Sequence, residues 1–268
     1  MDYEFSYYDA PIRPYVRENG ARVFGSLKPA RTVTVEQCRE MITSGALRAL
    51  TERVRAAATA DAMRDAKQTL LPYVTPAGVF RERRAAAVTR LSGCFVIDVD
   101  HLDTAREAEE LRDAIGHDSR LAPLLTFVSP SGRGVKALVP WQPWRGEGWR
   151  GDEERTLFAG TPDQRGTPDQ RDTPDPSVPT TRGEGEGNAP RGAARPYDPA
   201  PLFSVDPRDP TPEHLEDWAR AVREAMMYVA WTYGIGEGAA GVDTACKDVS
   251  RACFLCHDGR AVAAGEDR

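Results

Sequence analysis

A short apolar segment that ends in two aspartates constrains this chain more than any other part of its sequence. Residues 92–100 read Ser-Gly-Cys-Phe-Val-Ile-Asp-Val-Asp, and an apolar run of this length after a Ser-Gly turn is typical of a buried β-strand. Side chains alternate along a strand, so we expect Asp98 and Asp100 on one face. Two carboxylates this close repel each other unless a cation lies between them or one is protonated. The pattern predicts a site for a hard divalent ion such as Mg²⁺ or, alternatively, an acidic turn after the strand.

Length and composition indicate one large domain or two small ones. The chain has 268 residues and five cysteines, which are odd in number and unevenly spaced, so a disulfide framework is not expected. It has no apolar run long enough to span a membrane, and residues 1–5 lack the features of a secretion signal. These observations predict a cytoplasmic protein without a membrane partner.

The net charge of −6 is unevenly distributed along the chain. Residues 141–215 contain nine arginines and fourteen acidic residues, a balance of −5, so the rest of the chain has a balance of −6 − (−5) = −1. A nearly neutral folded part can still present a basic groove. Net charge therefore neither supports nor excludes a nucleic-acid partner.

A low-complexity segment interrupts the chain. Thr-Pro-Asp-Gln-Arg occurs at 161–165 and again at 167–171, and Gly, Pro and charged residues dominate to about residue 210. Such a segment buries too little apolar surface to offset its chain entropy. We therefore predict a disordered insertion at 145–210 within one domain that is formed by residues 1–144 and 211–268. A true domain boundary at this segment is the alternative.

A glycine-rich turn at residues 129–136, Ser-Pro-Ser-Gly-Arg-Gly-Val-Lys, lies between two predicted strands, 123–128 and 135–139. Glycines let a backbone approach an anion closely, and serine hydroxyls and basic side chains add polar contacts. The Walker spacing of a P-loop is missing, and a strand follows instead of a helix. The turn is either an ordinary hairpin or a phosphate-binding site, whose predicted contacts are Ser129, Ser131, Gly132, Arg133, Gly134 and Lys136.

Helical patterns flank these two motifs. We expect helices at 34–44, with a capping box, at about 46–66, from 103 or 104 to 116, and from Thr211 to about Gly234. The third of these has a predicted buried stripe of Ala108, Leu111, Ala114 and Ile115. A first strand is expected at 21–27 and a late one at 252–256. The simplest interpretation of the late cysteines is that they are buried and reduced. The alternatives are a zinc site or a haem attachment site formed by Cys246, Cys253, Cys256 and His257.

The order of the motifs resembles a known family more than any single motif does. The motifs in question are Lys67-x-x-Leu70-Leu71-Pro72, Pro76-Ala77-Gly78-Val79-Phe80, residues 92–102, residues 129–136, Asp243, and Asp248-Val249-Ser250-Arg251-Ala252-Cys253-Phe254. Together they resemble the N-terminal domain of virulence-associated E-like proteins, the BT4734-like domain. That family is similar to the archaeo-eukaryotic primase superfamily, which includes primase-polymerases. The resemblance covers about 60–140 and 211–259.

The resemblance implies an α+β fold with an RRM-like palm core of the archaeo-eukaryotic primase type and flanking helices. It implies that Asp98, Asp100 and Asp243 are catalytic and hold Mg²⁺ or Mn²⁺. Lys136 lies near the position where the superfamily has a histidine that contacts the nucleotide, and lysine is a good point-charge ligand for phosphate. Arg251, in the last motif, joins the predicted phosphate contacts.

The function implied is nucleotidyl transfer by a primase-polymerase-like domain of a replication or mobile-element protein. The expected partners are nucleoside triphosphates, single-stranded DNA or a primer-template, and a helicase-type ATPase, which family members often precede. This sequence has no ATPase motif, so we expect a fragment or a separate ATPase partner. Because Lys136 replaces the usual histidine, a catalytically inactive nucleic-acid-binding module stays open as an alternative, as does a metal-dependent phosphohydrolase that uses the same acids.

Overall fold

The computed structural model describes residues 3–17, 19–141, 208–236 and 241–265. By their internal contacts, residues 1–144 and 206–268 form one unit and residues 145–205 another. The second unit lies outside the described residues. The predicted insertion at 145–210, with its Thr-Pro-Asp repeats, therefore also lies outside them, apart from residues 208–210.

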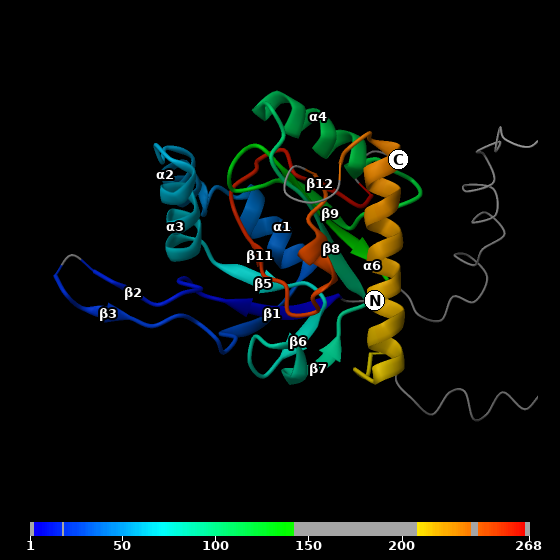
Figure 1. Cartoon of the computed structure of the whole chain (residues 1–268), viewed down its shortest axis with the longest axis horizontal. Helices are drawn as coiled ribbons and strands as arrows, with labels where there is room; N and C mark the ends of the chain where they lie inside the picture. The colour runs from blue at the N-terminus through cyan, green and yellow to red at the C-terminus, as the bar shows by residue number, and fades with distance from the viewer. Residues whose placement is uncertain (1–2, 18, 142–207, 237–240, 266–268) are drawn as a thin grey trace, which may run out of the picture. The chain divides into compact units, whose positions relative to one another are not determined.

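The described chain has a mixed α/β fold with antiparallel sheets (Figure 1). Its helices are α1 (Val35–Thr43), α2 (Arg48–Arg55), α3 (Ala60–Leu70), α4 (Ala105–Gly116) and α6 (Pro212–Thr232). Its strands are β1 (Glu4–Tyr8), β2 (Tyr15–Val16), β3 (Arg22–Val23), β4 (Arg31–Thr34), β5 (Tyr73–Thr75), β6 (Gly78–Phe80), β7 (Val88–Leu91), β8 (Cys94–Val99), β9 (Leu125–Val128), β10 (Val135–Pro140), β11 (Cys253–Phe254) and β12 (Val262–Ala263).

The sheet that contains the Asp-x-Asp strand has the order β12-β9-β10-β8, with every pair antiparallel. The predicted hairpin is present as β9 and β10, and β10 pairs with β8 so that Lys136 stands opposite Asp98. Val242 forms an antiparallel bridge to Val99 along the other edge of β8. A segment from late in the chain therefore lies beside the end of the strand that carries the aspartates.

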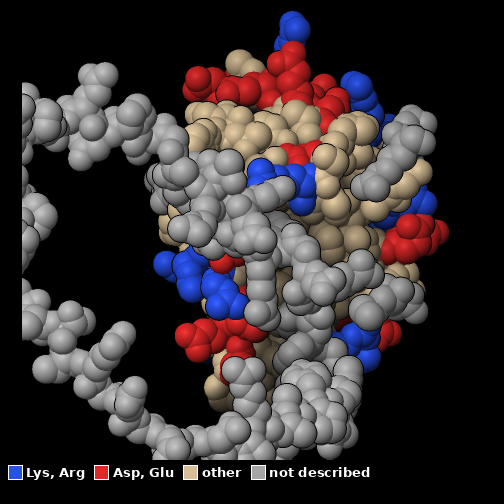
Figure 2. Space-filling model, turned by 90° about the vertical axis from the view of Figure 1, so that its right-hand side faces the viewer, with Lys and Arg blue, Asp and Glu red and all other residues tan. Residues whose placement is uncertain are grey.

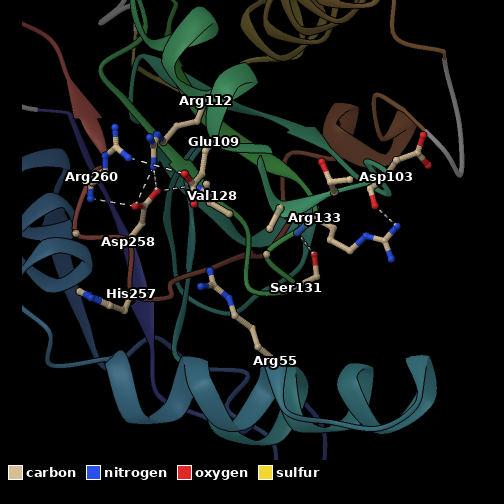
Figure 3. A pocket seen from close by; sticks show the side chains of 14 residues that line it. Arg55, Asp103, Glu109, Arg112, Val128, Ser131, Arg133, His257, Asp258 and Arg260 are labelled. Atoms are coloured by element: carbon tan, nitrogen blue, oxygen red, sulfur yellow. Dashed lines mark hydrogen bonds and ion pairs between the residues drawn. The ribbon is translucent and has the colours of Figure 1, made fainter. Parts of the chain in front are cut away.

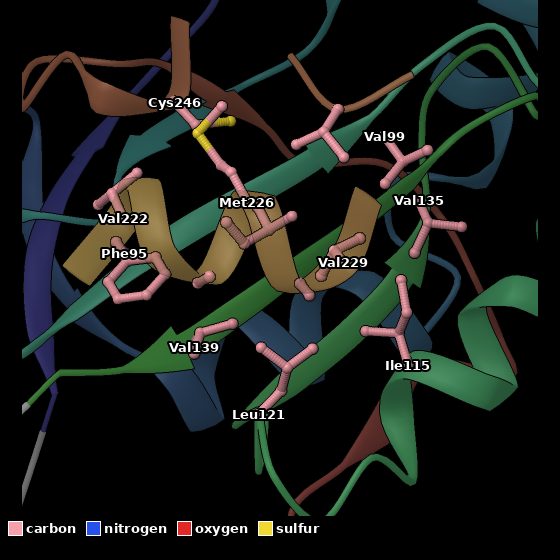
Figure 4. Packing of buried hydrophobic residues seen from close by; sticks show 14 of the residues in the cluster. Phe95, Val99, Ile115, Leu121, Val135, Val139, Val222, Met226, Val229 and Cys246 are labelled. Atoms are coloured by element: carbon pink, nitrogen blue, oxygen red, sulfur yellow. The ribbon is translucent and has the colours of Figure 1, made fainter. Parts of the chain in front are cut away.

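One face of this sheet packs against α4 and α6. Phe95, Val99, Val135 and Val139 project from β8 and β10 into a buried cluster with residues of α6 such as Val229 (Figure 4). The pattern follows strand alternation, because odd-numbered residues of β8 and β10 point toward the helices. The helix predicted from Thr211 is α6, and its buried face packs here; its buried residues are His214, Trp218, Val222, Ala225, Met226 and Val229.

The opposite face of the sheet shares a second cluster with the sheet β11-β5-β1-β4 and with α1 and α2. Val96 and Leu138 belong to this cluster. Asp98 and Lys136, two positions along the same strands, are also buried, at 3% and 5% exposure. The even-numbered face of β8 thus changes from apolar to charged at the end of the strand, inside the protein.

The helix predictions hold best where a cap fixes the start. Thr34 and Gln37 form the expected capping box of α1, and Thr211 caps α6. The single helix expected at about 46–66 is wrong, because the chain forms α2 and α3 instead. The Thr59 side chain accepts a hydrogen bond from the Ala62 N–H and starts a second helix there.

Two further expectations are corrected. Ala114 is exposed, and Arg112 takes a buried place on α4 beside Ala108 and Ile115. Periodicity does not predict this, because a buried arginine depends on acidic partners from elsewhere in the fold. The strand expected at 21–27 shrinks to the two residues of β3, and β1 precedes it in the chain.

Within the described residues, every helix is too short or too polar to cross a lipid bilayer.

The buried Arg112 gives a test of this fold. Its Nη1 donates to Asp258 at 3.2 Å, and Asp258 also accepts from the Val128 N–H at 2.8 Å. Asp258→Ala leaves a buried guanidinium without this partner, so we expect it to lower the free energy of unfolding by about 3–5 kcal/mol in urea denaturation. The control is Asp113→Ala, which removes the more exposed partner of the same arginine. Equal losses in the two variants would contradict the assigned role of Asp258.

Candidate functional site

Three aspartates from two distant parts of the chain meet at the end of β8. The Asp243 N–H donates to the Asp98 carbonyl at 2.8 Å, and the Asp100 N–H donates to the Gly241 carbonyl at 2.9 Å. These bonds flank the Val99–Val242 bridge. Backbone hydrogen bonds thus hold Asp243 beside Asp98 and Asp100, independently of the contacts that its side chain makes.

The three carboxylates, here called the acidic triad, are close enough to share one ion. Each offers an oxygen that lies within 4.8 Å of the other two. Ligand oxygens lie about 2.0–2.6 Å from ions such as Mg²⁺ and Ca²⁺. Two oxygens bound to the same ion are therefore at most about 5 Å apart. Asp98 Oδ1 is buried and has no hydrogen-bond partner. Because a buried acceptor without a partner is costly, this atom and the donor set fit a bound divalent cation.

Basic side chains balance the acidic triad. Lys136 Nζ forms a buried ion pair and hydrogen bond with Asp98 Oδ2. Arg251 Nη2 pairs with Asp243 Oδ2 and lies 3.7 Å from Asp98 Oδ2. Both basic residues were among the predicted phosphate contacts, and the structure brings both to the acidic triad.

Lys67 of α3 is a site residue that the sequence reasoning did not single out. It is partly buried, and its pKa is lowered by burial and by Lys136, while the charges of Asp100 and Asp98 act in the opposite direction. Its Nζ also lies 5.6 Å from the centre of the Phe254 ring. The signal that could have found it is the Lys67-x-x-Leu70-Leu71-Pro72 motif, which was read only as part of the family pattern.

The pKa shifts reflect the crowding of charges around Asp98. Burial, followed by the repulsion of Asp98, raises the pKa of Asp100, although Lys136 opposes this. Burial, followed by the repulsion of Lys136, lowers the pKa of Lys67. Burial alone would lower the pKa of Lys136, but the charge of Asp98, the neighbouring Asp100 and the hydrogen bond to Asp98 together raise it above its usual value. Lys136 is therefore held as a cation.

The formal charges at the site nearly cancel: three carboxylates meet the ion-paired Lys136 and Arg251, and Lys67 is near enough for its charge to act on Asp100. One oxygen each of Asp98 and Asp243 is engaged by a basic side chain, and Asp243 Oδ1 accepts from the Ala245 N–H at 2.9 Å. Asp98 Oδ1 and the half-buried Asp100 carboxylate remain as the ready metal ligands. Chemically, the three carboxylates supply oxygens for a divalent cation, and Lys136 and Arg251 supply positive charge at the same place.

The glycine-rich turn lies directly against the acidic triad at one position. A Cβ atom on Gly134 would lie 2.3 Å from the Val99 carbonyl, 2.9 Å from Ser129 Oγ and 3.3 Å from Asp100 Oδ1. Glycine is needed here because no side chain fits between these atoms. Ser129 and Gly134 thus connect the end of β8 to the turn, and Ser129 Oγ lies 3.0 Å from Ser131 Oγ.

The rest of the turn faces a separate pocket of ≈ 530 Å³ (Figure 3). Ser131, Gly132 and Arg133 line it, and none of the acidic triad does. Arg133 donates to the carbonyls of Leu102 and Asp103 at 2.9 and 2.7 Å. The predicted phosphate contacts are thus divided between two places: Lys136 and Arg251 lie at the acidic triad, and Ser131 to Arg133 lie in this pocket.

Arg55 of α2 is a second residue that the sequence reasoning missed. It enters the same pocket, where it donates to the carbonyls of Ser129 and Pro130, each at 3.3 Å (Figure 3). Asp258 in this pocket is already bound to Arg112 and to the Val128 N–H. No local sequence pattern connects Arg55 to residues 129–130, because the contact depends on how α2 packs.

The cysteines do not form a metal site among the residues that the structure describes. There, the acidic triad is the group of histidine, cysteine or acidic residues with metal-binding geometry. All five cysteines are free and buried. Burial raises the pKa of Cys253 to about 11 and that of Cys256 to about 12, which keeps both as neutral thiols. This agrees with the expectation of buried reduced cysteines.

Comparison with known proteins finds a family model that matches part of the chain. Residues 65–151 match the family model described as BT4734-like, N-terminal domain. The matched segment contains Asp98, Asp100 and Lys136, whereas Asp243 and Arg251 lie beyond it. No curated protein and no solved structure matches the chain. The match supports the domain family that the order of motifs had indicated.

Removing the lysine opposite Asp98 tests the charge balance of the site. Lys136→Met leaves the buried Asp98 carboxylate without its hydrogen-bonded partner, so we expect the free energy of unfolding to fall by about 3–5 kcal/mol without added metal. Mn²⁺ should then raise the melting temperature more in this variant than in the wild type, because the ion supplies the missing positive charge. Arg64→Met, which removes an exposed basic residue of α3 that pairs with Asp61 away from the triad, is the control and should respond to Mn²⁺ like the wild type. A Lys136→Met protein as stable as the wild type would contradict this account.

Proposed function

We propose that this chain is a primase-polymerase-like nucleotidyltransferase domain that uses divalent metal ions at the acidic triad. The expected setting is DNA replication or a mobile element, with an RRM-like palm core. Nucleoside triphosphates and single-stranded DNA or a primer-template are the proposed partners. The match of residues 65–151 to the BT4734-like N-terminal domain supports the domain family, and the link from that family to the primase superfamily rests on the resemblance of the motifs.

One observation carries the proposal. Asp98, Asp100 and Asp243 come from separate parts of the sequence and present oxygens within 4.8 Å of one another, while Asp98 Oδ1 is buried without a partner. If Asp98 and Asp100 only formed an acidic turn after the strand, a third carboxylate from Asp243 beside them would add electrostatic repulsion. Nucleotidyl transfer needs such a set, because bound metal ions activate the attacking hydroxyl and stabilise the leaving pyrophosphate.

The roles proposed for the side chains follow from their charge. Asp98, Asp100 and Asp243 hold the metal. We assign to Lys67 and Arg251 the contacts with the triphosphate, and to Lys136 the orientation of Asp98 through their buried ion pair. Two divalent ions and a triphosphate nearly cancel one another in charge, so a site that is already near neutral can accept them together without a large electrostatic penalty.

A second candidate function has its own support. Lys136 and Arg251 already bind one oxygen each of Asp98 and Asp243, which leaves fewer oxygens for metal. A nucleic-acid-binding module that has lost catalysis could keep its acids in place with such pairs. A metal-dependent phosphohydrolase would use the same triad and differs from the first proposal in its products.

Metal binding is tested by thermal stability. Mg²⁺ or Mn²⁺ should raise the melting temperature, because a ligand that binds only the folded state stabilises it by about 2.7 kcal/mol at a hundredfold excess over its Kd. Asp98→Asn with Asp100→Asn should abolish the shift, and Asp243→Asn should reduce it. Asp61→Asn, at an exposed carboxylate of α3, is the control and should respond like the wild type. A shift that survives in the Asp98/Asp100 variant would exclude the triad as its cause.

Catalysis is tested by primer extension and de novo priming with Mn²⁺ or Mg²⁺. We expect template-dependent products from the wild type and none from the variant with Asp98→Ala and Asp100→Ala. A metal-dependent thermal shift without any product would favour the non-catalytic module. Metal-dependent hydrolysis of a phosphodiester or phosphomonoester, without nucleotide incorporation, would favour the phosphohydrolase.

A further inference from the structure

A two-stranded ribbon extends from the N-terminal part of the chain, and no role has been assigned to it. Strands β2 and β3 pair antiparallel, with Tyr15 opposite Val23 and Val16 opposite Arg22. Figure 1 shows them reaching away from the two sheets. Residues 12–26 are here called the basic arm. We ask what partner its surface fits.

The charge of the basic arm is opposite to that of the whole chain. Residues 12–26 contain three arginines and one glutamate, a balance of +2, within a chain of net charge −6. Arg13, Arg17 and Arg22 are exposed, and none lies within 4 Å of a carboxylate among the described residues. Acidic residues gather elsewhere, for example on α4, which lies toward the top of the molecule in Figure 1. Figure 2 shows a group of acidic side chains at the top.

The basic arm also exposes large apolar side chains. Phe24 is 78% exposed and Val16 62% exposed, and Leu27, just past the arm, is 47% exposed. They are three of the five large apolar residues that stand exposed in the described part of the chain. Strand pairing puts Val16 and Arg22 side by side, and Phe24 follows directly after β3. The arm thus combines an exposed aromatic ring with exposed guanidinium groups.

We propose that the basic arm binds single-stranded nucleic acid. Arg13, Arg17 and Arg22 supply charges for backbone phosphates, and Phe24 supplies a surface on which a base can stack. The exposed ring favours a single strand over a duplex, because bases in a duplex are already stacked on each other. This inference names a substrate-binding surface for the proposed function, but it does not depend on metal or catalysis.

The base of the arm is fixed to α3, the helix that carries Lys67. The Ile12 N–H donates to the Gln68 carbonyl at 2.9 Å, and Gln68 follows Lys67 on α3. The Ser26 N–H donates to the Pro11 carbonyl at 2.8 Å, and the Ser26 carbonyl accepts from the Tyr73 hydroxyl. A strand bound along the arm is therefore led to the helix that places Lys67 at the triad.

Gly25 keeps the two sides of the arm together at its base. A Cβ atom at this position would lie 2.7 Å from the Ile12 carbonyl oxygen and 3.2 Å from the Arg13 carbonyl carbon. Both neighbours are backbone atoms, which cannot move aside as a flexible side chain can. Gly25→Ala should therefore disturb the arm without changing its charge.

The test measures the affinity of the full chain for a fluorescein-labelled 20-nucleotide mixed-sequence DNA strand by anisotropy, in EDTA and at several salt concentrations. Arg13→Ser, Arg17→Ser and Arg22→Ser together should weaken binding at least tenfold. They should also reduce the slope of log K against log salt by about 2, since each phosphate contact in single strands contributes about 0.7. Phe24→Ser should weaken binding on the order of tenfold while leaving the slope unchanged.

The matched control removes three exposed arginines elsewhere. Arg64, Arg106 and Arg220 lie on helices and are paired with Asp61, Glu110 and Asp217. Their replacement by serine changes net charge equally but should leave affinity within about twofold at physiological salt, where distant charges are screened. Equal losses in the control and arm variants, or no loss in the arm variant, would overturn the proposal. So would tighter binding of the matched duplex, or binding only to vesicles that contain phosphatidylserine.

The proposal and the proposed function can fail separately. Binding is measured without metal, so loss of affinity in the arm variant supports the arm even if no priming is found. The arm variant should retain the Mn²⁺-dependent thermal shift, because the triad is unchanged. An arm variant that loses this shift is misfolded and cannot be used to measure DNA binding. In that event, DNA binding is measured with Gly25→Ala and Phe24→Ser. If neither variant weakens DNA binding, the proposal is rejected.

Discussion

The buried ion pair between Lys136 and Asp98 is the interaction on which the candidate site depends. Both residues stand on the side of β8 and β10 that otherwise packs apolar side chains such as Val96 and Leu138. A single buried charge there would be strongly unfavourable, and the cross-strand partner makes it tolerable. The pair also leaves Asp98 Oδ1 without a hydrogen bond. The protein thus holds a carboxylate inside its core with one oxygen that no hydrogen bond occupies.

Two edges of one strand assemble the rest of the site. On one edge, β10 brings Lys136 opposite Asp98; on the other, the chain around Val242 pairs with Val99 and brings Asp243 alongside. Gly134 allows the turn before β10 to lie against Asp100. Backbone pairing therefore positions charged side chains that would otherwise repel one another. A bound ion, or the basic residues around it, then stabilises the arrangement.

Much of this could be predicted locally. Thr34 and Thr211 are N-caps that bond to residues within the first turn of each helix. The starts of α1 and α6 can therefore be predicted from neighbouring residues. The shared face of Asp98 and Asp100 follows from strand alternation alone. The split of one expected helix into α2 and α3 depended on Thr59, whose capping competes with alanine-rich helix continuation. The buried Arg112 depended on Asp258, which is 146 residues away.

The sequence by itself determined the apolar strand, its two terminal aspartates, the hairpin after it, and the family pattern that connects them to Asp243. These are local patterns, or an order of motifs, and they need no knowledge of packing. Only the tertiary structure decided that Lys136 and Arg251 face the acidic triad while Arg133 faces another pocket, and that Lys67 and Arg55 join these sites. Such outcomes depend on which elements pack together, because a long basic side chain reaches whichever neighbour the fold puts within a few ångströms.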